Sequence, residues 1–321
     1  MSKVGSVLVE APARLHFGVL DLGGRLGRCF GGLGAAIPSP SLLLEAAQSN
    51  RLTGEGPDAD RAIEFARRFL AYHQIRTGAH LLIRRAIPGH SGLGSGTQLG
   101  LSVARALAQV YGISDEVLEL ARATGRGRRS AIGTWAFALG GFIVEGGRRP
   151  DSPNIAPLLA RFVIPPAWRY VLAVPSQGRG LSGEAEARAF EALPSPPDRE
   201  VERVAHLVLM QLLPALVEDD LPSFGDALSQ VQQITGGWFA AQQGGVFAPG
   251  PTQEVIARMS SWGAVGVGQS SWGPAAYGLV QGEEAARSLA AEIAGFLGSD
   301  GSVFEGEFAV RGARSWAPGR V

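Results

Sequence analysis

Apolar and polar residues alternate early in the chain in the way that half-buried strands require. Apolar runs at residues 7–9 and 15–20 predict two strands, which Pro12 separates, and alternation at residues 81–83 predicts a third. The segment at residues 21–34 contains six glycines, which do not favour regular structure, so we expect a long loop there. The first part of the chain is therefore predicted to be rich in strands.

Helical spacing of apolar residues appears between and after these strands. Residues 58–73 carry apolar side chains on one face and arginines on the other, which predicts a helix buried on one side. A second helical pattern starts directly after residue 98. In the remaining chain the pattern predicts strands at 142–145, 170–174 and 276–280, helices at 201–217 (interrupted at Pro214) and 255–262, and a glycine loop at 265–274.

Prolines at positions 150, 153 and 157 interrupt the pattern near the middle of the chain. Such breaks are typical of linkers, and 321 residues is about twice a typical domain length. We therefore expect two domains, at residues 1–160 and 161–321. No segment repeats at a fixed spacing, which argues against a solenoid.

Composition narrows the class of protein. Hydrophobic residues make up 45% of the chain and charged residues 18%, a balance typical of globular proteins rather than disordered ones. The 29 basic and 29 acidic side chains cancel, so any anionic ligand must be held locally rather than by an overall field. A single cysteine excludes an internal disulfide. The lack of a long apolar run and of a signal-like N-terminus predicts a cytoplasmic protein without membrane spans.

Glycine accounts for 45 residues, about twice the usual share, and it is clustered. The strand at 81–83 runs into Gly-Leu-Gly-Ser-Gly-Thr-Gln at residues 92–98, and a helix follows. A glycine turn at a helix N-terminus presents backbone N–H groups to a phosphate. A Walker A loop is excluded because the only lysine is Lys3. The third glycine is misplaced for a Rossmann fingerprint, and the acidic pair that typical phosphoribosyltransferases carry before a Thr-Gly-x-Thr turn is missing.

The chain resembles the GHMP kinase superfamily in three motifs that occur in the same order. Ala-Pro-Ala-Arg-Leu-His-Phe-Gly at residues 11–18 resembles the N-terminal motif, residues 88–95 resemble the phosphate loop, and the glycine block at 266–273 resembles the third motif. The resemblance implies an α+β, two-lobed fold. Its N-terminal α/β domain would carry the glycine phosphate loop, and its C-terminal domain would be ferredoxin-like.

Five segments resemble one branch of this superfamily, the β-ribofuranosylaminobenzene 5′-phosphate synthases. They lie at residues 14–18, 92–98, 140–144, 181–184 and 268–274, the last reading Gly-Gln-Ser-Ser-Trp-Gly-Pro. The resemblance implies a transferase that condenses phosphoribosyl pyrophosphate with 4-aminobenzoate and releases carbon dioxide and pyrophosphate in tetrahydromethanopterin biosynthesis. The sequence alone does not decide between 4-aminobenzoate and 4-hydroxybenzoate as the acceptor. It also implies Mg²⁺ as a cofactor and a homodimer as the assembly.

The first of these segments supplies Arg14 and His16, which are predicted to be catalytic together with Arg126 from the glycine and arginine segment at residues 125–130. His16 can donate to the leaving oxygen or accept the proton of the aryl amine. Arg126, with Arg128 and Arg129, is predicted to clamp the 5′-phosphate or the benzoate carboxylate. The structural alternatives are a hydrogen-bonded core histidine and a solvated basic loop.

Hydroxyl, amide and aromatic side chains complete the predicted site. Ser95 and Glu184 are the predicted Mg²⁺ ligands, with Thr97 as the alternative to Ser95, and Trp272 offers an aromatic face to a flat benzoate. A capped strand-to-helix turn and a buried tryptophan are the structural alternatives. The predicted substrate-binding residues are Gly92, Gly94, Ser95, Gly96, Thr97, Gln98, Ser130, Gln269, Ser270, Ser271 and Trp272.

One position separates the chain from many kinases of the superfamily. Those kinases carry a catalytic Asp in a Ser-Gly-Ile-Asp string, whereas Ser-Ala-Ile-Gly at residues 130–133 places glycine there. Without that carboxylate no evident base deprotonates an alcohol for attack on ATP, although phosphate binding remains. A small-molecule kinase and a non-catalytic ligand-binding protein stay as the alternatives to the transferase.

Overall fold

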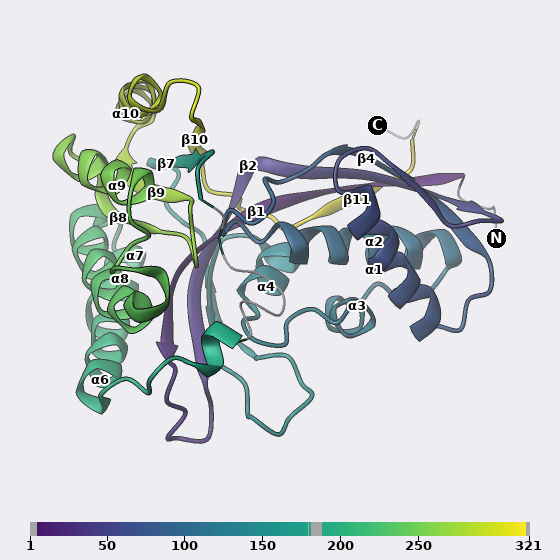
Figure 1. Cartoon of the computed structure of the whole chain (residues 1–321), viewed down its shortest axis with the longest axis horizontal. Helices are drawn as coiled ribbons and strands as arrows, with labels where there is room; N and C mark the ends of the chain where they lie inside the picture. The colour runs from purple at the N-terminus through teal and green to yellow at the C-terminus, as the bar shows by residue number, and fades with distance from the viewer. Residues whose placement is uncertain (1–4, 179, 181–187, 319–321) are drawn as a thin grey trace.

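Two sheets, each covered by helices, form two lobes that lie side by side (Figure 1). The computed structural model describes residues 5–178, 180 and 188–318. The chain passes from the first sheet to the second between residues 162 and 168, and its last strand returns to the first sheet. The division at residue 160 stays a prediction.

The first lobe contains a seven-stranded sheet with helices against it. Its main path has the order β11-β1-β2-β4-β3, and β5 and β6 continue from β2. The strands are β1 (Ser6–Asp21), β2 (Phe30–Ser49), β3 (Thr53–Glu55), β4 (Gly78–Arg85), β5 (Phe142–Glu145), β6 (Leu158–Phe162) and β11 (Arg314–Trp316). The helices are α1 (Ala59–Tyr72), α2 (Ser95–Tyr111), α3 (Val117–Thr124) and α4 (Ile132–Leu139).

The two predicted N-terminal strands are one strand. Strand β1 continues through Pro12, and its pairing with β2 shifts register between Pro12 and Ala13. Because the ladder is irregular at that point, a residue without an N–H group is accommodated there. The long loop predicted at 21–34 is also wrong in its second half, since β2 begins at Phe30.

The second lobe confirms the ferredoxin-like expectation. Its four-stranded antiparallel sheet has the order β10-β7-β9-β8, and the chain runs strand, helices, strand, strand, helix, strand. The strands are β7 (Trp168–Pro175), β8 (Val265–Gln269), β9 (Ala276–Gln281) and β10 (Gly301–Glu307). The helices are α6 (Asp198–Leu207), α7 (Leu213–Val217), α8 (Leu221–Gln243), α9 (Pro251–Ser261) and α10 (Glu283–Leu297), with a π-helical turn η1 (Val208–Leu212) between α6 and α7.

Two corrections concern this lobe. Residues 265–269, predicted as part of a glycine loop, form strand β8, and only the turn that follows is irregular. Helix α8 was not predicted, because Gly236 and Gly237 interrupt its apolar pattern. A Cβ at Gly236 would lie 2.5 Å from the Val246 carbonyl oxygen, so the glycine permits the chain after the helix to pack against it.

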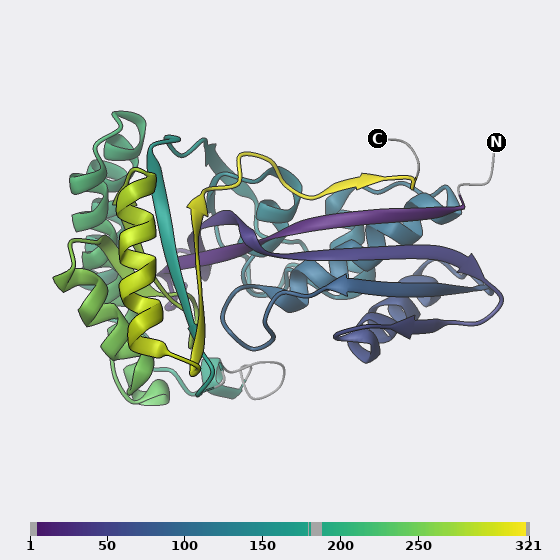
Figure 2. The same cartoon turned by 90° about the horizontal axis from the view of Figure 1, so that it is seen from above.

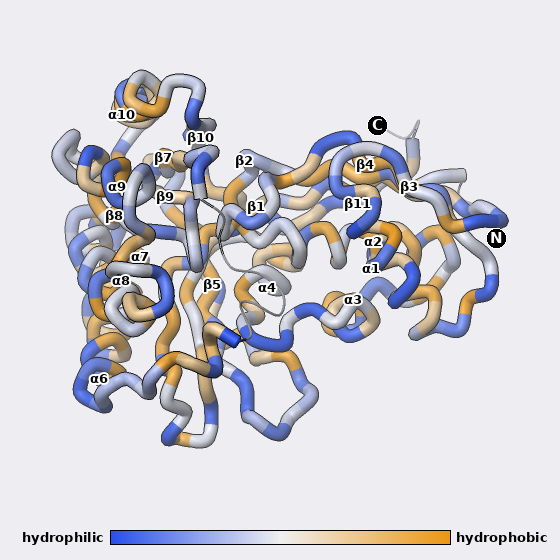
Figure 3. Tube along the Cα trace, viewed as in Figure 1, coloured by the Kyte–Doolittle hydropathy of each residue, from blue (hydrophilic) through white to orange (hydrophobic). Residues whose placement is uncertain are grey.

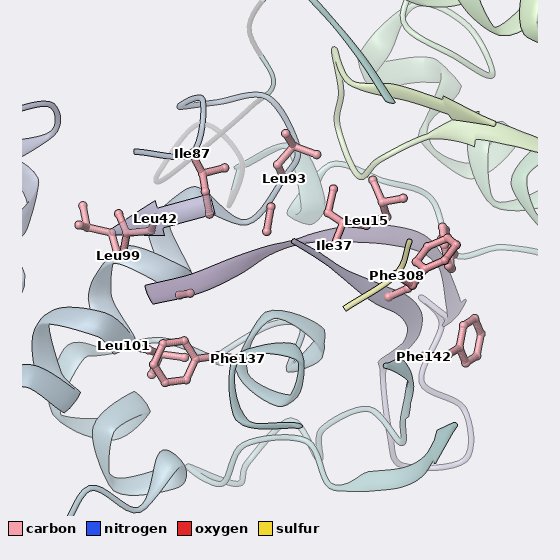
Figure 4. Close-up of a cluster of buried hydrophobic side chains, with 14 of the residues drawn as sticks. Leu15, Ile37, Leu42, Ile87, Leu93, Leu99, Leu101, Phe137, Phe142 and Phe308 are labelled. Atoms are coloured by element: carbon pink, nitrogen blue, oxygen red, sulfur yellow. The ribbon is translucent and has the colours of Figure 1, made fainter. Parts of the chain in front are cut away.

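Strands β1 and β2 reach from the first lobe to the second, as Figure 2 shows from above. Helix α8 packs across β1 at Gly18, where an added Cβ would lie 2.9 Å from Val231 Cγ1. In the first lobe, Leu15 and Ile37 on these strands and Leu101 and Phe137 on the helices belong to one buried cluster (Figure 4). Hydrophilic stretches gather mainly in the peripheral loops (Figure 3). Among the described residues no helix is both long and apolar enough to cross a membrane.

Candidate functional site

A cavity of about 350 Å³ opens where the two lobes meet. Strand β1 contributes Arg14 and His16, the loop before α4 contributes residues 125–130, and α8 contributes five residues from Gln232 to Gln243. The turn after β8 closes the cavity with Ser271 and Trp272. The first and third GHMP-like motifs, far apart in sequence, therefore meet here, and Thr97 joins them from the helix that follows the second motif.

The predicted phosphate loop has the geometry of an anion site at a helix N-terminus. Helix α2 starts at Ser95 after Gly94, whose φ of 79° lies in the left-handed region, and no side chain caps the helix. A Cβ at Gly94 would lie 3.1 Å from Arg14 Cγ, so the glycine lets this guanidinium approach the loop. At Gly92 a Cβ would collide with the Ser270 carbonyl oxygen.

Three arginines surround the start of α2. Arg14 Nη1 donates to the Gly92 carbonyl, and Arg126 Nη2 donates to Thr97 Oγ1 at 3.0 Å. A Cβ built on Gly96 would lie 2.9 Å from Arg61 Nη2 and 3.5 Å from Arg126 Nη2. Guanidinium groups and the positive end of the helix dipole together favour a polyanion such as a pyrophosphate. Arg61, on α1, was not predicted from the sequence.

His16 is a neutral group at physiological pH. Burial, and to a lesser degree the charge of Arg14, lower the pKa of His16 to about 3. Its backbone N–H donates to Ser270 Oγ at 3.0 Å, and its Nε2 lies 3.3 Å from Ser130 Oγ. With so low a pKa the imidazole is a weak proton acceptor, while a neutral ring can still donate a hydrogen bond from its N–H group, and both predicted roles of His16 stay predictions.

Aromatic rings from the start of β2 and from the second lobe line part of the cavity. Trp272 meets Phe239 at 4.9 Å and Phe190 at 5.5 Å between ring centroids, both edge to face. Phe30 meets Phe190 at 5.5 Å, and the Arg129 guanidinium lies 5.5 Å over the Phe190 ring. We call Phe30, Phe190, Phe239 and Trp272 the aromatic wall. Such rings suit the flat face of a benzoate.

The structure divides the predicted substrate-binding residues into two groups. Thr97, Ser130, Gln269, Ser271 and Trp272 line the cavity, as do the predicted catalytic residues Arg14, His16 and Arg126. The residues that are not part of this lining are Gly92, Gly94, Ser95, Gly96, Gln98 and Ser270. The substrate roles of all these residues stay predictions.

Two of the second group have clear structural partners. Gln98 is fully buried, and its Nε2 donates to the Gly133 carbonyl at 2.9 Å. Ser270 is also fully buried, and its hydroxyl donates to the Gly92 carbonyl at 2.7 Å while it accepts from the His16 N–H. Ser270 therefore ties the phosphate loop to β1 and to the turn after β8.

The predicted metal ligands are only partly visible. Glu184 lies outside the described residues. The described part of the chain holds no group of three or more His, Cys, Asp or Glu side chains arranged to bind a metal ion. Mg²⁺ at a phosphate site usually has one or two protein ligands and takes the rest from substrate and water. The Ser95 hydroxyl, at the first position of α2, fits that limited role.

The residue that replaces the kinase Asp lies next to the phosphate loop. A Cβ at Gly133 would lie 3.1 Å from Thr97 Cγ2, and none of the described residues that line the cavity is Asp or Glu. Four arginines, Arg14, Arg126, Arg128 and Arg129, line it instead. The described lining thus favours anionic substrates and offers no carboxylate to activate an alcohol.

Sequence reasoning missed most of the second lobe's contribution. Phe190 and Phe239 line the cavity but belong to no glycine motif, and Gln232, Thr235 and Gln243 lie on the unpredicted helix α8. A signal in the sequence is Gly236, because a glycine inside a helix can mark the close approach of another segment, here the Val246 carbonyl.

Comparisons with known proteins agree with this geometry. Residues 60–141 match the family "GHMP kinases N terminal domain", and residues 212–298 match "GHMP kinases C terminal". Among solved structures, a homoserine kinase from Cytophaga hutchinsonii has a TM-score of 0.71 at 18% identity and covers 98% of this chain and 99% of its own. The mevalonate kinase of L. major has a TM-score of 0.70 at 15% identity, covering 94% and 95%. These likenesses confirm the fold.

Relatives with higher sequence identity are named as synthases rather than as kinases. The β-ribofuranosylphenol 5′-phosphate synthase of Methanothermobacter thermautotrophicus is 34% identical over 313 residues, which cover 91% of this chain and 93% of that protein. The protein of the same name from Archaeoglobus fulgidus is 36% identical over 238 residues, which cover 70% and 75%.

Proposed function

Because this chain belongs to the β-ribofuranosylphenol 5′-phosphate synthase family within the GHMP kinase superfamily, we propose that it is a decarboxylating pentosyltransferase. It joins the anomeric carbon of phosphoribosyl pyrophosphate to a benzoate ring, in tetrahydromethanopterin biosynthesis. The acceptor expected from the sequence is 4-aminobenzoate. The relatives' name specifies a phenol product, so 4-hydroxybenzoate is the alternative that a test must include.

The observation that carries the proposal is the joining of two unlike surfaces in one cavity. One is cationic and lies at the start of α2, where Arg14 and Arg126 contact the phosphate loop. The other is the aromatic wall, with Arg129 beside it. A pyrophosphate-bearing sugar fits the first surface, and an aromatic carboxylate fits the second.

In the reaction each reactant loses one bond, and a new carbon–carbon bond joins the two. The bond from the anomeric carbon to pyrophosphate breaks, and its electron pair leaves with the pyrophosphate. The ring carbon that bears the carboxylate attacks the anomeric carbon, assisted by the para amino or hydroxyl group. The carboxylate then leaves as carbon dioxide, and the electron pair of that bond restores the aromatic ring.

The described residues have distinct roles in this reaction. Arg126 and the N–H groups at the start of α2 bind the departing pyrophosphate, where a preorganised donor is worth about 3–4 kcal/mol. The Ser95 hydroxyl would help to hold Mg²⁺, and the bound ion would neutralise further charge on the pyrophosphate. Arg129 holds the benzoate carboxylate beside the aromatic wall, and this contact weakens as carbon dioxide forms. The homodimer stays a prediction.

The proposal is tested with phosphoribosyl pyrophosphate, Mg²⁺ and benzoates labelled at the carboxyl carbon. We expect labelled carbon dioxide and pyrophosphate in equal amounts with 4-aminobenzoate or 4-hydroxybenzoate, and none with benzoate itself, which lacks the electron-donating para group. Replacing Arg126 with Ala should reduce both products together, because its loss leaves the pyrophosphate less stabilised. Release of pyrophosphate without carbon dioxide, or ATP consumption with a small alcohol instead, would contradict the proposal.

A further inference from the structure

Helix α8 places one hydroxyl group on the cavity, that of Thr235. The residue is 3% exposed, so its side chain borders the cavity and is otherwise enclosed by protein. At Gly18, which also lines the cavity, an added Cβ would lie 3.6 Å from Thr235 Oγ1. Because glycine has no side chain, the hydroxyl oxygen stays open to the cavity at this point.

The hydrogen bonding of Thr235 makes its oxygen an acceptor. Oγ1 donates its only proton to the Val231 carbonyl at 2.9 Å, one turn earlier in α8. A hydroxyl oxygen also has two lone pairs, and no group of the described residues donates a hydrogen bond to them. Thr235 can therefore accept a hydrogen bond from a ligand in the cavity, whereas its own proton is already used.

Two amide side chains near Thr235 have the same polarity. Gln243 lies two turns further along α8, and Phe239 of the aromatic wall lies between the two residues on the same face. Gln243 Nε2 donates to two backbone carbonyls after the helix, and its Oε1 accepts from Gln269 Nε2 at 3.1 Å. Gln269 Nε2 donates its second proton to a backbone carbonyl at 3.0 Å. Both amides therefore have lone pairs to offer a ligand, and their N–H groups are used within the protein.

These hydrogen-bond acceptors fix the direction of a benzoate along the aromatic wall. A carboxylate has only lone pairs, so it is repelled at Thr235 and attracted to the Arg129 guanidinium, 5.5 Å over the Phe190 ring. Phe190 and Phe239 are 5.8 Å apart between centroids, so the wall continues from Arg129 to α8. The carboxylate end then faces the loop at residues 125–130, which contacts the start of α2, and the para substituent faces Thr235.

We propose that Thr235 is a catalytic residue whose Oγ1 accepts a hydrogen bond from the para amino or hydroxyl group of the benzoate. The assignment rests on the proposed function, because it names the residue that recognises the para substituent of that substrate. When the ring carbon attacks the anomeric carbon, the para group gives electron density to the ring, and its N–H or O–H becomes more positive. The hydrogen bond to Oγ1 therefore strengthens towards the transition state, so it raises kcat.

The test uses two benzoates whose para groups both donate electrons but differ in one proton. 4-Hydroxybenzoate carries an O–H group, and 4-methoxybenzoate carries a methyl group in place of that hydrogen. With phosphoribosyl pyrophosphate and Mg²⁺, we expect the wild-type kcat/KM for carbon dioxide release to be at least roughly tenfold higher for 4-hydroxybenzoate. Thr235→Val keeps the shape of the side chain and removes its oxygen. The ratio of the two kcat/KM values should then fall at least roughly fivefold, while any steric effect of the methyl group stays.

Further variants separate an effect on the reaction from an effect on the fold. With 4-hydroxybenzoate, kcat of Thr235→Val should fall at least roughly tenfold, while the KM for phosphoribosyl pyrophosphate changes by less than about threefold. Thr235→Ser keeps the hydroxyl and should retain the wild-type ratio, and Thr235→Ala serves if Thr235→Val does not fold. The matched control is Thr124→Val, because Thr124 is a fully buried threonine of α3 outside the cavity lining. Its hydroxyl also donates to a carbonyl one turn earlier, at 2.8 Å, and its loss should leave the ratio unchanged.

The two proposals fail in different ways. Equal kcat/KM values for the two benzoates in the wild type, or an unchanged ratio in folded Thr235→Val, overturn the assignment of Thr235. The release of carbon dioxide and pyrophosphate would still uphold the proposed function in that case. An equal fall of the ratio in Thr124→Val also overturns the assignment, because the effect would then come from the fold. No carbon dioxide from any benzoate refutes the proposed function and the inference with it. A ratio that falls only in the Thr235 variants that lack the hydroxyl supports both.

Discussion

Replacing Trp272 with Leu tests the assignment of the aromatic wall to the acceptor. Trp272 is 7% exposed and lines the cavity, so its indole borders the site as well as the protein interior. A ring that packs on a flat benzoate contributes about 0.5–1.5 kcal/mol beyond the area that it buries, which corresponds to a roughly 2- to 13-fold change in affinity. We therefore expect the KM of the acceptor to rise by that factor while the KM of phosphoribosyl pyrophosphate stays within about twofold.

The same substitution also has a structural cost. The indole makes edge-to-face contacts with Phe190 and Phe239, and losing two such pairs costs about 1–3 kcal/mol of folding free energy. The matched control is Trp238→Leu, because Trp238 is 6% exposed, lies in the same lobe and does not line the cavity. Both variants should show a lower Tm, and only Trp272→Leu should show the acceptor effect.

Steady-state kinetics with each substrate varied in turn, together with thermal unfolding of both variants, provide the measurement. Equal weakening of both substrates would mean that Trp272 supports the whole site from behind. An acceptor KM no different from that of Trp238→Leu would place the benzoate elsewhere. Either result would refute the reasoning that links the aromatic wall to the acceptor.

Three further predictions follow from the same site. Gly94→Ala should lower kcat/KM at least roughly tenfold with a small change in Tm, because the added methyl would crowd Arg14 at a left-handed backbone position; a collapsed fold would contradict this. His16 should make the wild type lose stability relative to His16→Gln as the pH falls from 6.5 towards 3, by about 2 kcal/mol at pH 5 in urea titrations, since the unfolded chain binds the proton that the folded chain excludes; parallel pH curves would argue against it. ATP turnover that depends on a small alcohol should be absent, because Gly133 replaces the kinase carboxylate; a coupled assay that detects it at ordinary enzyme rates would be decisive against this expectation.

The predictions that succeeded rest on local signals. The strand, glycine loop and helix around residues 78–111 were predicted because periodicity and left-handed glycines act within a few residues. Predictions failed where tertiary contacts override local preference. Pro12 lies within a strand because the ladder is irregular there, and helix α8 tolerates Gly236 because a neighbouring chain segment fills the space.

The candidate site shows the same division. The motifs indicated correctly that His16, Thr97 and Trp272 belong to one place, since three motifs in a shared order imply a shared fold. They did not indicate that Ser270 is a buried connector, because the motif gives its position and not the direction of its side chain. Glu145, the buried last residue of β5, also escaped notice, because only the packed structure shows that its side chain accepts hydrogen bonds from the Ala131 and Gly147 N–H groups.

The sequence by itself therefore determined the chemistry available to this protein: a phosphate loop, a set of arginines, a histidine on a strand and a glycine where a kinase acid would be. The tertiary structure decided which of these groups meet. Phe190, Phe239 and Trp272 form one wall although they are far apart along the chain, and Ser130 lies 3.3 Å from the ring of His16, 114 residues away in sequence. Local patterns show which face of a segment is buried and where the chain turns. Contacts between distant segments depend instead on how the two lobes pack against each other.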